Sequence, residues 1–167
     1  MKWPQRFLDF FCQIEAPFSK VLEADGCREG WLQAECFRAF QSCGLKTNQV
    51  VSGVKHDLVC DLHPKMIAEI KIYVDDIKRH KARIRDRGRL PWLLADIETL
   101  GPQTGSYLAD VLRLMKKSGS EERYMILILP NAEDSVISQV HVAESNREFE
   151  RKFGTFRVRI SMLHDVS

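Results

Sequence analysis

Charged residues that could bind a metal ion occur within two apolar runs at residues 56–74, HDLVCDLHPKMIAEIKIYV. The two runs flank a His-Pro-Lys turn, and they contain Asp57, Asp61, Glu69 and Lys71. A charge is costly to bury without a partner, so a purely structural strand would not favour these residues. Side chains alternate across a strand, which lets apolar and charged residues occupy opposite faces of the same hairpin.

The spacing of the charged residues predicts that they share one face. Alternate residues of the second run form an apolar face: Met66, Ala68, Ile70, Ile72 and Val74. If the turn centres on Pro64, Asp57 lies opposite Lys71, and Val59 lies opposite Glu69. Opposed residues of an antiparallel pair point to the same side, so the two carboxylates and the lysine should cluster. A register shift of one residue would break the cluster.

Two carboxylates and a lysine in contact suit metal-assisted hydrolysis of a phosphodiester. Magnesium prefers oxygen ligands and keeps several waters, so two carboxylates and a carbonyl are a sufficient protein contribution. The metal lowers the pKa of a bound water, and a lysine can orient that water or stabilise developing negative charge. We predict that Asp57 and Glu69 bind Mg²⁺ or Mn²⁺ and that Lys71 positions the water. Asp61 has the same parity and is the alternative first ligand.

An Asp on one strand followed by Glu-x-Lys on the next resembles the PD-(D/E)XK superfamily of restriction-endonuclease-like nucleases. The matching residues here are Asp57 and then Glu69-Ile70-Lys71, with His56 where the motif's name has Pro. The resemblance implies an α/β restriction-endonuclease-like core of a helix, a three-strand meander, a helix and a further strand. The implied activity is Mg²⁺-dependent hydrolysis of DNA, with RNA left open as a substrate.

The same resemblance implies two further site residues. The family commonly adds an acidic residue from the first core helix, and Glu35 fits the inward arc of residues 30–40, where it would bind a second metal ion or its water. Glu29 is the weaker candidate. Some branches, which resemble recombination-repair exonucleases, carry Gln-x-x-x-Tyr on the next helix, matched here by Gln103 and Tyr107. Positions four apart share a helix face, so Gln103 could orient Lys71 or the substrate.

The apolar periodicity predicts one α/β domain over residues 1–167, built around a mixed sheet. Helices are expected over about residues 3–23, 30–44, 90–101, 103–117 and 133–152. Pro17 predicts a break or kink in the first helix. Strands are expected at 47–51, in both runs of the hairpin, at 124–130 and at 155–162. The run YMILILP is typical of a strand buried on both faces.

A basic run follows the hairpin, within what would be an insertion at about residues 75–100. Its cations are Lys78, Arg79, Lys81, Arg83, Arg85, Arg87 and Arg89. They could neutralise nucleic-acid phosphates beside the scissile bond, without reading sequence. The alternative is an ordinary solvated segment. The net charge is only +2, so attraction to a polyanion would have to be local.

Other features exclude several classes of protein. The five cysteines form no CxxC pair, which favours reduced thiols over a zinc site. No apolar run approaches the roughly 20 residues of a membrane span, so we expect a cytoplasmic protein without membrane contact. Neither a Gly-rich phosphate loop nor a G-x-S-x-G elbow is present, which argues against an NTPase or an α/β-hydrolase.

Two alternative functions stay open at this point. A catalytically inactive domain of the same fold could act as a nucleic-acid or protein-binding module. A structural subunit could instead use a partner to cover its apolar N-terminal helix. Double-strand cutters of this class often pair two sites, so a homodimer is one expectation for the nuclease.

Overall fold

The computed structural model describes residues 2–24, 27–62, 64–72, 107–115, 119–130 and 145–163. Its helices are α1 (Trp3–Glu23), α2 (Arg28–Phe40), the 3₁₀ turn η1 (Gln41–Cys43) and α6 (Tyr107–Met115). Its strands are β1 (Leu45–Val51), β2 (Val54–Cys60), β3 (Met66–Ile72), β4 (Glu122–Pro130), β5 (Ser145–Lys152) and β6 (Phe156–Leu163). None of these helices is long and apolar enough to cross a membrane.

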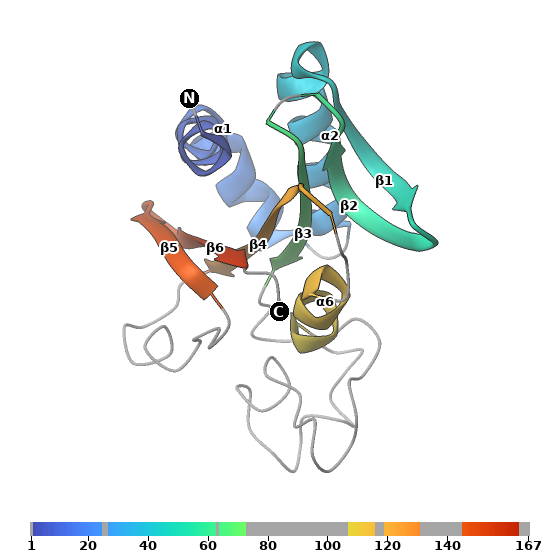
Figure 1. Cartoon of the computed structure of the whole chain (residues 1–167). Helices are drawn as coiled ribbons and strands as arrows, with labels where there is room; N and C mark the ends of the chain where they lie inside the picture. Colours follow the sequence, from blue (N-terminus) through green and yellow to red (C-terminus); the bar gives the residue numbers. More distant parts are fainter. Residues whose placement is uncertain are drawn as a thin grey trace, which may run out of the picture.

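The strands form one mixed sheet in the order β1-β2-β3-β4-β6-β5 (Figure 1). The first three strands are an antiparallel meander, β4 runs parallel to β3, and β6 and β5 continue the sheet antiparallel. Parallel neighbours need a crossover connection, and α6 lies in the one between β3 and β4. The predicted α/β class with a mixed sheet is therefore confirmed.

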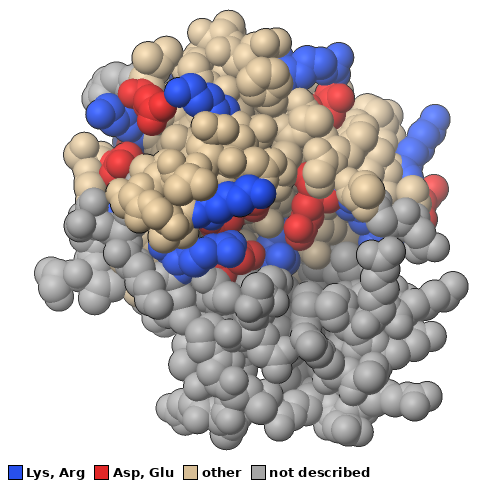
Figure 2. Space-filling model, turned by 90° about the vertical axis from the view of Figure 1, so that its right-hand side faces the viewer, with Lys and Arg blue, Asp and Glu red and all other residues tan. Residues whose placement is uncertain are grey.

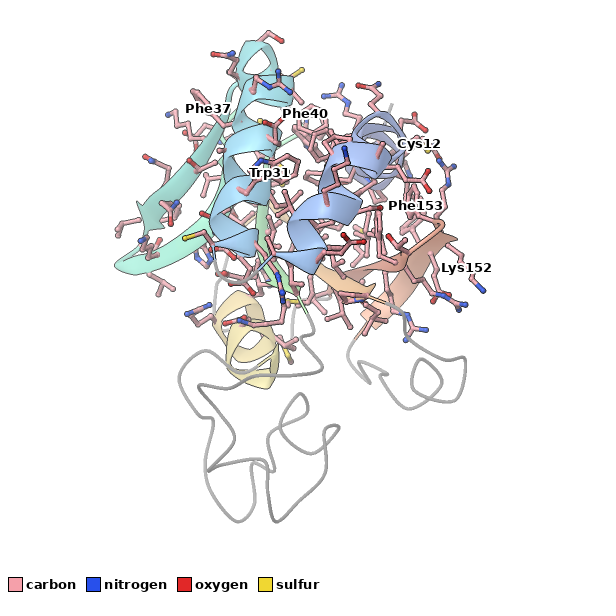
Figure 3. All side chains as sticks on the ribbon, turned by 180° about the vertical axis from the view of Figure 1, so that it is seen from behind. Cys12, Trp31, Phe37, Phe40, Lys152 and Phe153 are labelled. Carbon is pink, nitrogen blue, oxygen red and sulfur yellow. The ribbon has the colours of Figure 1, made fainter. Side chains whose placement is uncertain are left out.

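The two faces of the sheet carry different helices and separate cores. On one face, α1 and α2 pack an aromatic-rich cluster against alternate residues of the strands, among them Leu58, Ala68 and Ile70. On the other face, Val111 and Leu114 of α6 pack with the intervening residues, such as Ile67. The view from behind shows α1 and α2 together over the sheet, with Trp31 and Phe40 labelled on α2 (Figure 3).

The β2–β3 hairpin differs in register from the prediction. Val59 pairs with Ile67 rather than with Glu69, so the pairing is shifted by two residues. Strand β2 ends at Cys60 and β3 begins at Met66, and in the loop between them the Pro64 carbonyl oxygen accepts from Trp3 Nε1 at 2.8 Å. A shift of two preserves parity for the paired residues, 58–60 and 66–68.

The C-terminal helix predicted over 133–152 is wrong where the structure describes it, because residues 145–152 form β5. Cross-strand ion pairs from Glu150 to Arg157 and Arg159 of β6 explain charged residues that resembled a solvated helix face. Helix α1 runs through Pro17 without the predicted break. Phe11 and Phe18, on either side of Pro17, are both buried in the same core and hold the two halves together.

Three predictions lie outside the described residues. These are the helix over 90–101, the basic insertion at about 75–100, and the part of the 103–117 helix that contains Gln103. The expected buried strand at 124–130 is confirmed as part of β4, whose residues 123–129 are all buried. The expected strands at 47–51 and 155–162 are also confirmed, as β1 and β6.

Candidate active site

The site begins where β2 and β3 separate. Beyond their last paired residues, the backbone N–H groups of Ile70 and Ile72 on β3 are not paired with β2, although both residues stay paired with β4 on the other edge of the strand. Two carboxylates take that place: Asp57 Oδ2 accepts from Ile70 N at 2.8 Å, and Glu29 Oε1 accepts from Ile72 N at 3.1 Å. Because buried N–H groups need acceptors, these two bonds fix a β2 side chain and an α2 side chain against β3.

Glu69 is buried in the middle of this region, with only 1% of its surface exposed. Its Oε1 lies 2.7 Å from Nδ1 of His56, and its Oε2 accepts from Nη2 of Arg113 on α6 at 3.2 Å. His56 is equally buried, and within the part of the chain that the structure describes its Nε2 has no hydrogen-bond partner. Glu69 is thus a buried carboxylate with a nitrogen partner at each oxygen, as a buried charge requires.

Lys71 projects from the same face of β3 and contacts two more carboxylates. Its Nζ lies 3.5 Å from Glu29 Oε1 and 3.4 Å from Asp110 Oδ2 on α6. Asp110 also pairs with Arg113, one turn further along α6. Burial lowers the pKa of Lys71, but the charges of Glu29, Asp110 and Asp57 outweigh burial and raise it above its usual value. The lysine therefore carries a positive charge at neutral pH.

Two carboxylates of the site, Asp57 and Asp110, have raised pKa values. Burial raises the pKa of Asp57 to about 6; the Ile70 N–H acts in the opposite direction, and the neighbouring Glu69 raises the pKa further. Burial also raises the pKa of Asp110, although Lys71 and Arg113 lower it in part. The charged members of the cluster are Glu29, Asp57, Glu69, Asp110, Lys71 and Arg113. Fully ionised, the cluster carries two more negative charges than positive ones.

The structure brings together Asp57, Glu69 and Lys71 at the gap between β2 and β3. They do not share one face in the predicted way, because Asp57 contacts the backbone of β3 and Gln33 of α2, whereas Glu69 contacts Arg113 of α6. The structure separates them from Asp61, whose carboxylate pairs with Lys46 at 3.0 Å on the exposed side of the hairpin. Of the two α2 candidates, Glu29 contacts Lys71 and β3, whereas Glu35 pairs with Arg38 on its own helix. Helical phase explains the difference, because positions 29 and 35 are six residues apart and face different directions.

Sequence reasoning missed Asp110, Arg113 and Gln33, and it gave His56 no role in the site. Gln33 Nε2 donates to Asp57 Oδ1 at 2.9 Å. One signal was available for Gln33. Glu29 and Gln33 lie four residues apart, so they share one face of α2. No local pattern marks Asp110 and Arg113, since their role depends on how α6 docks on β3.

Asp57 and Glu69 are the predicted metal ligands that the structure places in the site. Among the described residues, no group of three or more His, Cys, Asp or Glu side chains is arranged to hold a metal ion. Asp57 and Glu69 are two adjacent carboxylates, which fits a hard divalent cation that keeps most of its waters. Burial and, to a lesser extent, the Glu69 carboxylate raise the pKa of Asp57, and a bound cation would offset both by favouring the ionised form.

The described surface on the β1, β2 and α6 side carries no large patch of one charge. Figure 2 looks onto the right-hand side of Figure 1 and shows acidic and basic side chains interleaved there. The seven cations predicted to bind nucleic acid, and Gln103, lie outside the described residues. Their role in the site stays a prediction.

No known family matches the sequence, and no curated protein or solved structure was found to be similar to it. The function is therefore inferred from the geometry of the site itself.

Proposed function

We propose that this protein is a metal-dependent nuclease that hydrolyses phosphodiester bonds of DNA. The observation that carries the proposal is the convergence of Asp57, Glu69 and Lys71 at the gap where β2 and β3 separate. The element order supports a restriction-endonuclease-like core: α2, the β1–β3 meander, α6, and then β4 beside β3. That order is the one implied by the sequence resemblance.

Asp57 and Glu69 would hold Mg²⁺ or Mn²⁺, with Glu29 next to them. The cation would supply Lewis-acid catalysis and a bound water of lowered pKa. The two excess negative charges of the cluster match the charge of one divalent cation. Removal of that excess is a favourable contribution to binding, since like charges in a partly buried site repel strongly.

Lys71 acts as a donor rather than as a base in this proposal. Its raised pKa keeps it protonated, and an ammonium group has three N–H donors and no lone pair. Glu29 and Asp110 hold the ammonium in place, which leaves it able to orient a water or to stabilise negative charge on a phosphate oxygen. Asp110 therefore takes a positioning role toward Lys71.

The proposal is tested by incubating plasmid and single-stranded DNA with the protein in Mg²⁺, in Mn²⁺ and in chelator. We expect cleavage only with metal, and we expect Glu69→Gln to reduce the rate by about 100-fold or more, as loss of a charge-stabilising group does. Glu35→Gln is the matched control, since it removes the same charge from a carboxylate that pairs on α2. Metal-dependent cleavage that survives Glu69→Gln would contradict the assignment.

A second candidate is a catalytically inactive domain that binds nucleic acid or protein. It is favoured by the pairing of both Glu69 oxygens, to His56 and to Arg113, which closes the cluster without a cation. The same assay separates the two candidates. An inactive module would leave DNA uncut with every metal ion. If it binds nucleic acid, its affinity for DNA should fall steeply as the salt concentration rises.

A further inference from the structure

Two side-chain amides form a chain that ends on Asp57. Asn48 Nδ2 on β1 donates to Gln33 Oε1 on α2 at 2.8 Å, and Gln33 Nε2 donates to Asp57 Oδ1 at 2.9 Å. The other carboxylate oxygen accepts from Ile70 N at 2.8 Å. Each Asp57 oxygen therefore receives one N–H donor, and the plane of the carboxylate is fixed from both sides.

The carboxylate of Asp57 determines the orientation of both amides. A glutamine amide has one acceptor oxygen and one donor nitrogen, so it can be placed in two ways. Because an ionised Asp57 only accepts, Gln33 turns its nitrogen toward Asp57 and its oxygen toward β1, where Asn48 Nδ2 donates to it. An ionised carboxylate has about four acceptor positions, so the two N–H bonds leave one on each oxygen for a cation.

The backbone at Asn48 has an unusual conformation. Asn48 has φ +53°, a left-handed conformation that asparagine tolerates better than most residues. Its neighbours keep the β1–β2 register, with Thr47 paired to Leu58 and Gln49 paired to His56. Asn48 is thus an irregular residue inside a regular strand pair, opposite Asp57, and its side chain reaches across to α2. Unusual backbone conformations of this kind are concentrated at functional sites.

We propose that Gln33 and Asn48 are positioning residues that orient Asp57 for a divalent cation. The inference rests on the proposed function, and it adds to that function a hydrogen-bonded outer layer on the β1 side of the metal site. Outer partners of metal-binding carboxylates fix the geometry of the ligand, and their loss typically weakens metal binding about 10- to 100-fold.

The test is the isosteric change Asn48→Asp. An aspartate at 48 has only acceptors, so it competes with Asp57 for the Gln33 amide nitrogen, and Asp57 loses this donor whenever Gln33 turns toward β1. We expect Mn²⁺ binding, measured by electron paramagnetic resonance without DNA, to weaken about tenfold. Gln49→Glu is the matched control: it adds the same charge one residue away, where Gln49 Nε2 donates to the Thr47 carbonyl oxygen.

The sign of the effect separates positioning from simple electrostatics. A new negative charge near the site should by itself tighten Mn²⁺ binding, so weaker binding in Asn48→Asp and not in Gln49→Glu supports the relay. Equal Mn²⁺ affinity in the two variants, or tighter binding in Asn48→Asp, overturns it. Thermal unfolding of both variants checks that the difference is not a general loss of stability.

A metal-free measurement tests the relay separately from the proposed function. In the ¹⁵N-labelled apo protein, the Gln33 side-chain amide signals should shift in Asn48→Asp, because the amide changes its partner, and should shift much less in Gln49→Glu. Equal shifts in the two variants overturn the relay. Loss of Mn²⁺ binding in Glu69→Gln but not in Asn48→Asp overturns the positioning role alone. A wild type that binds no Mn²⁺ contradicts the metal site and, with it, that role.

Discussion

The ammonium group of Lys71 lies between Glu29 and Asp110, at 3.5 and 3.4 Å, and Asp57 adds a third negative charge nearby. These neighbours stabilise the charged form, so catalysis by Lys71 would proceed through hydrogen bonding and charge. Asp57 is in the opposite position, because burial and the Glu69 carboxylate both disfavour its ionised form. The surroundings therefore favour the charged form of Lys71 and the neutral form of Asp57.

Asp57 should make the apo protein less stable as the pH rises from about 4 to about 6. Its folded pKa of about 6 lies above its ordinary pKa of 3.8, so the folded state binds more protons than the unfolded state in this window. Stability must fall with pH wherever the folded state holds the extra proton. We expect Asp57→Asn to lose this part of the pH dependence of the thermal midpoint. Identical pH profiles for the two proteins would contradict it.

Arg113 should compete with a divalent cation for Glu69. Its guanidinium contacts Glu69 Oε2 at 3.2 Å, and its side chain is 39% exposed, so it can leave the carboxylate. We expect Arg113→Gln to bind Mn²⁺ more tightly, on the order of tenfold, because one positive charge is removed from the site. The apo variant should also unfold at a lower temperature than the wild type, and Mn²⁺ should restore the difference.

Arg38→Gln is the control for that change, because Arg38 pairs with Glu35 on the surface of α2. Surface pairs contribute little, so neither Mn²⁺ affinity nor stability should change much. Equal Mn²⁺ affinity in the Arg113 and Arg38 variants would show that Arg113 does not compete at Glu69.

At the scale of elements, the separation of β2 from β3 makes the site possible. If the strands stayed paired, the N–H groups of Ile70 and Ile72 would bond to β2 rather than to Asp57 and Glu29. At the other end of the hairpin, Trp3 Nε1 of α1 donates to the Pro64 carbonyl oxygen of the loop. The sequence alone could not place this contact, which joins residues 61 positions apart.

Trp3→Phe tests the loop contact while keeping an aromatic ring in the core. The change removes the Nε1–H donor at 2.8 Å and leaves the partly buried Pro64 carbonyl without that bond. We expect the free energy of unfolding to fall by about 1 kcal/mol from the hydrogen bond, with some further loss from the smaller ring. Urea denaturation measures the difference. An unchanged midpoint would show that the indole N–H does not contribute to holding the loop.

Across the whole molecule, patterns in the sequence predicted the features that depend on residues close together in the chain. The alternation in β2 and β3 predicted that Asp57, Glu69 and Lys71 lie close together, and the apolar run predicted β4. Long-range docking decided the rest. Asp110 reaches Lys71 only because α6 packs on β3, and β5 is a strand because β6 pairs with its charged residues. Strand formation depends on such partners more than on composition.

The most direct test of the nuclease assignment is the rate of Mg²⁺-dependent plasmid cleavage by Lys71→Met. Lys46→Met is the control, since it removes the same charge from a lysine paired with Asp61 on the exposed side of the hairpin. We predict that Lys71→Met cuts at least about 100-fold more slowly than the wild type, the usual effect of losing one charge-stabilising donor, and that Lys46→Met cuts at the wild-type rate. Equal cleavage rates for the two variants would contradict the assignment.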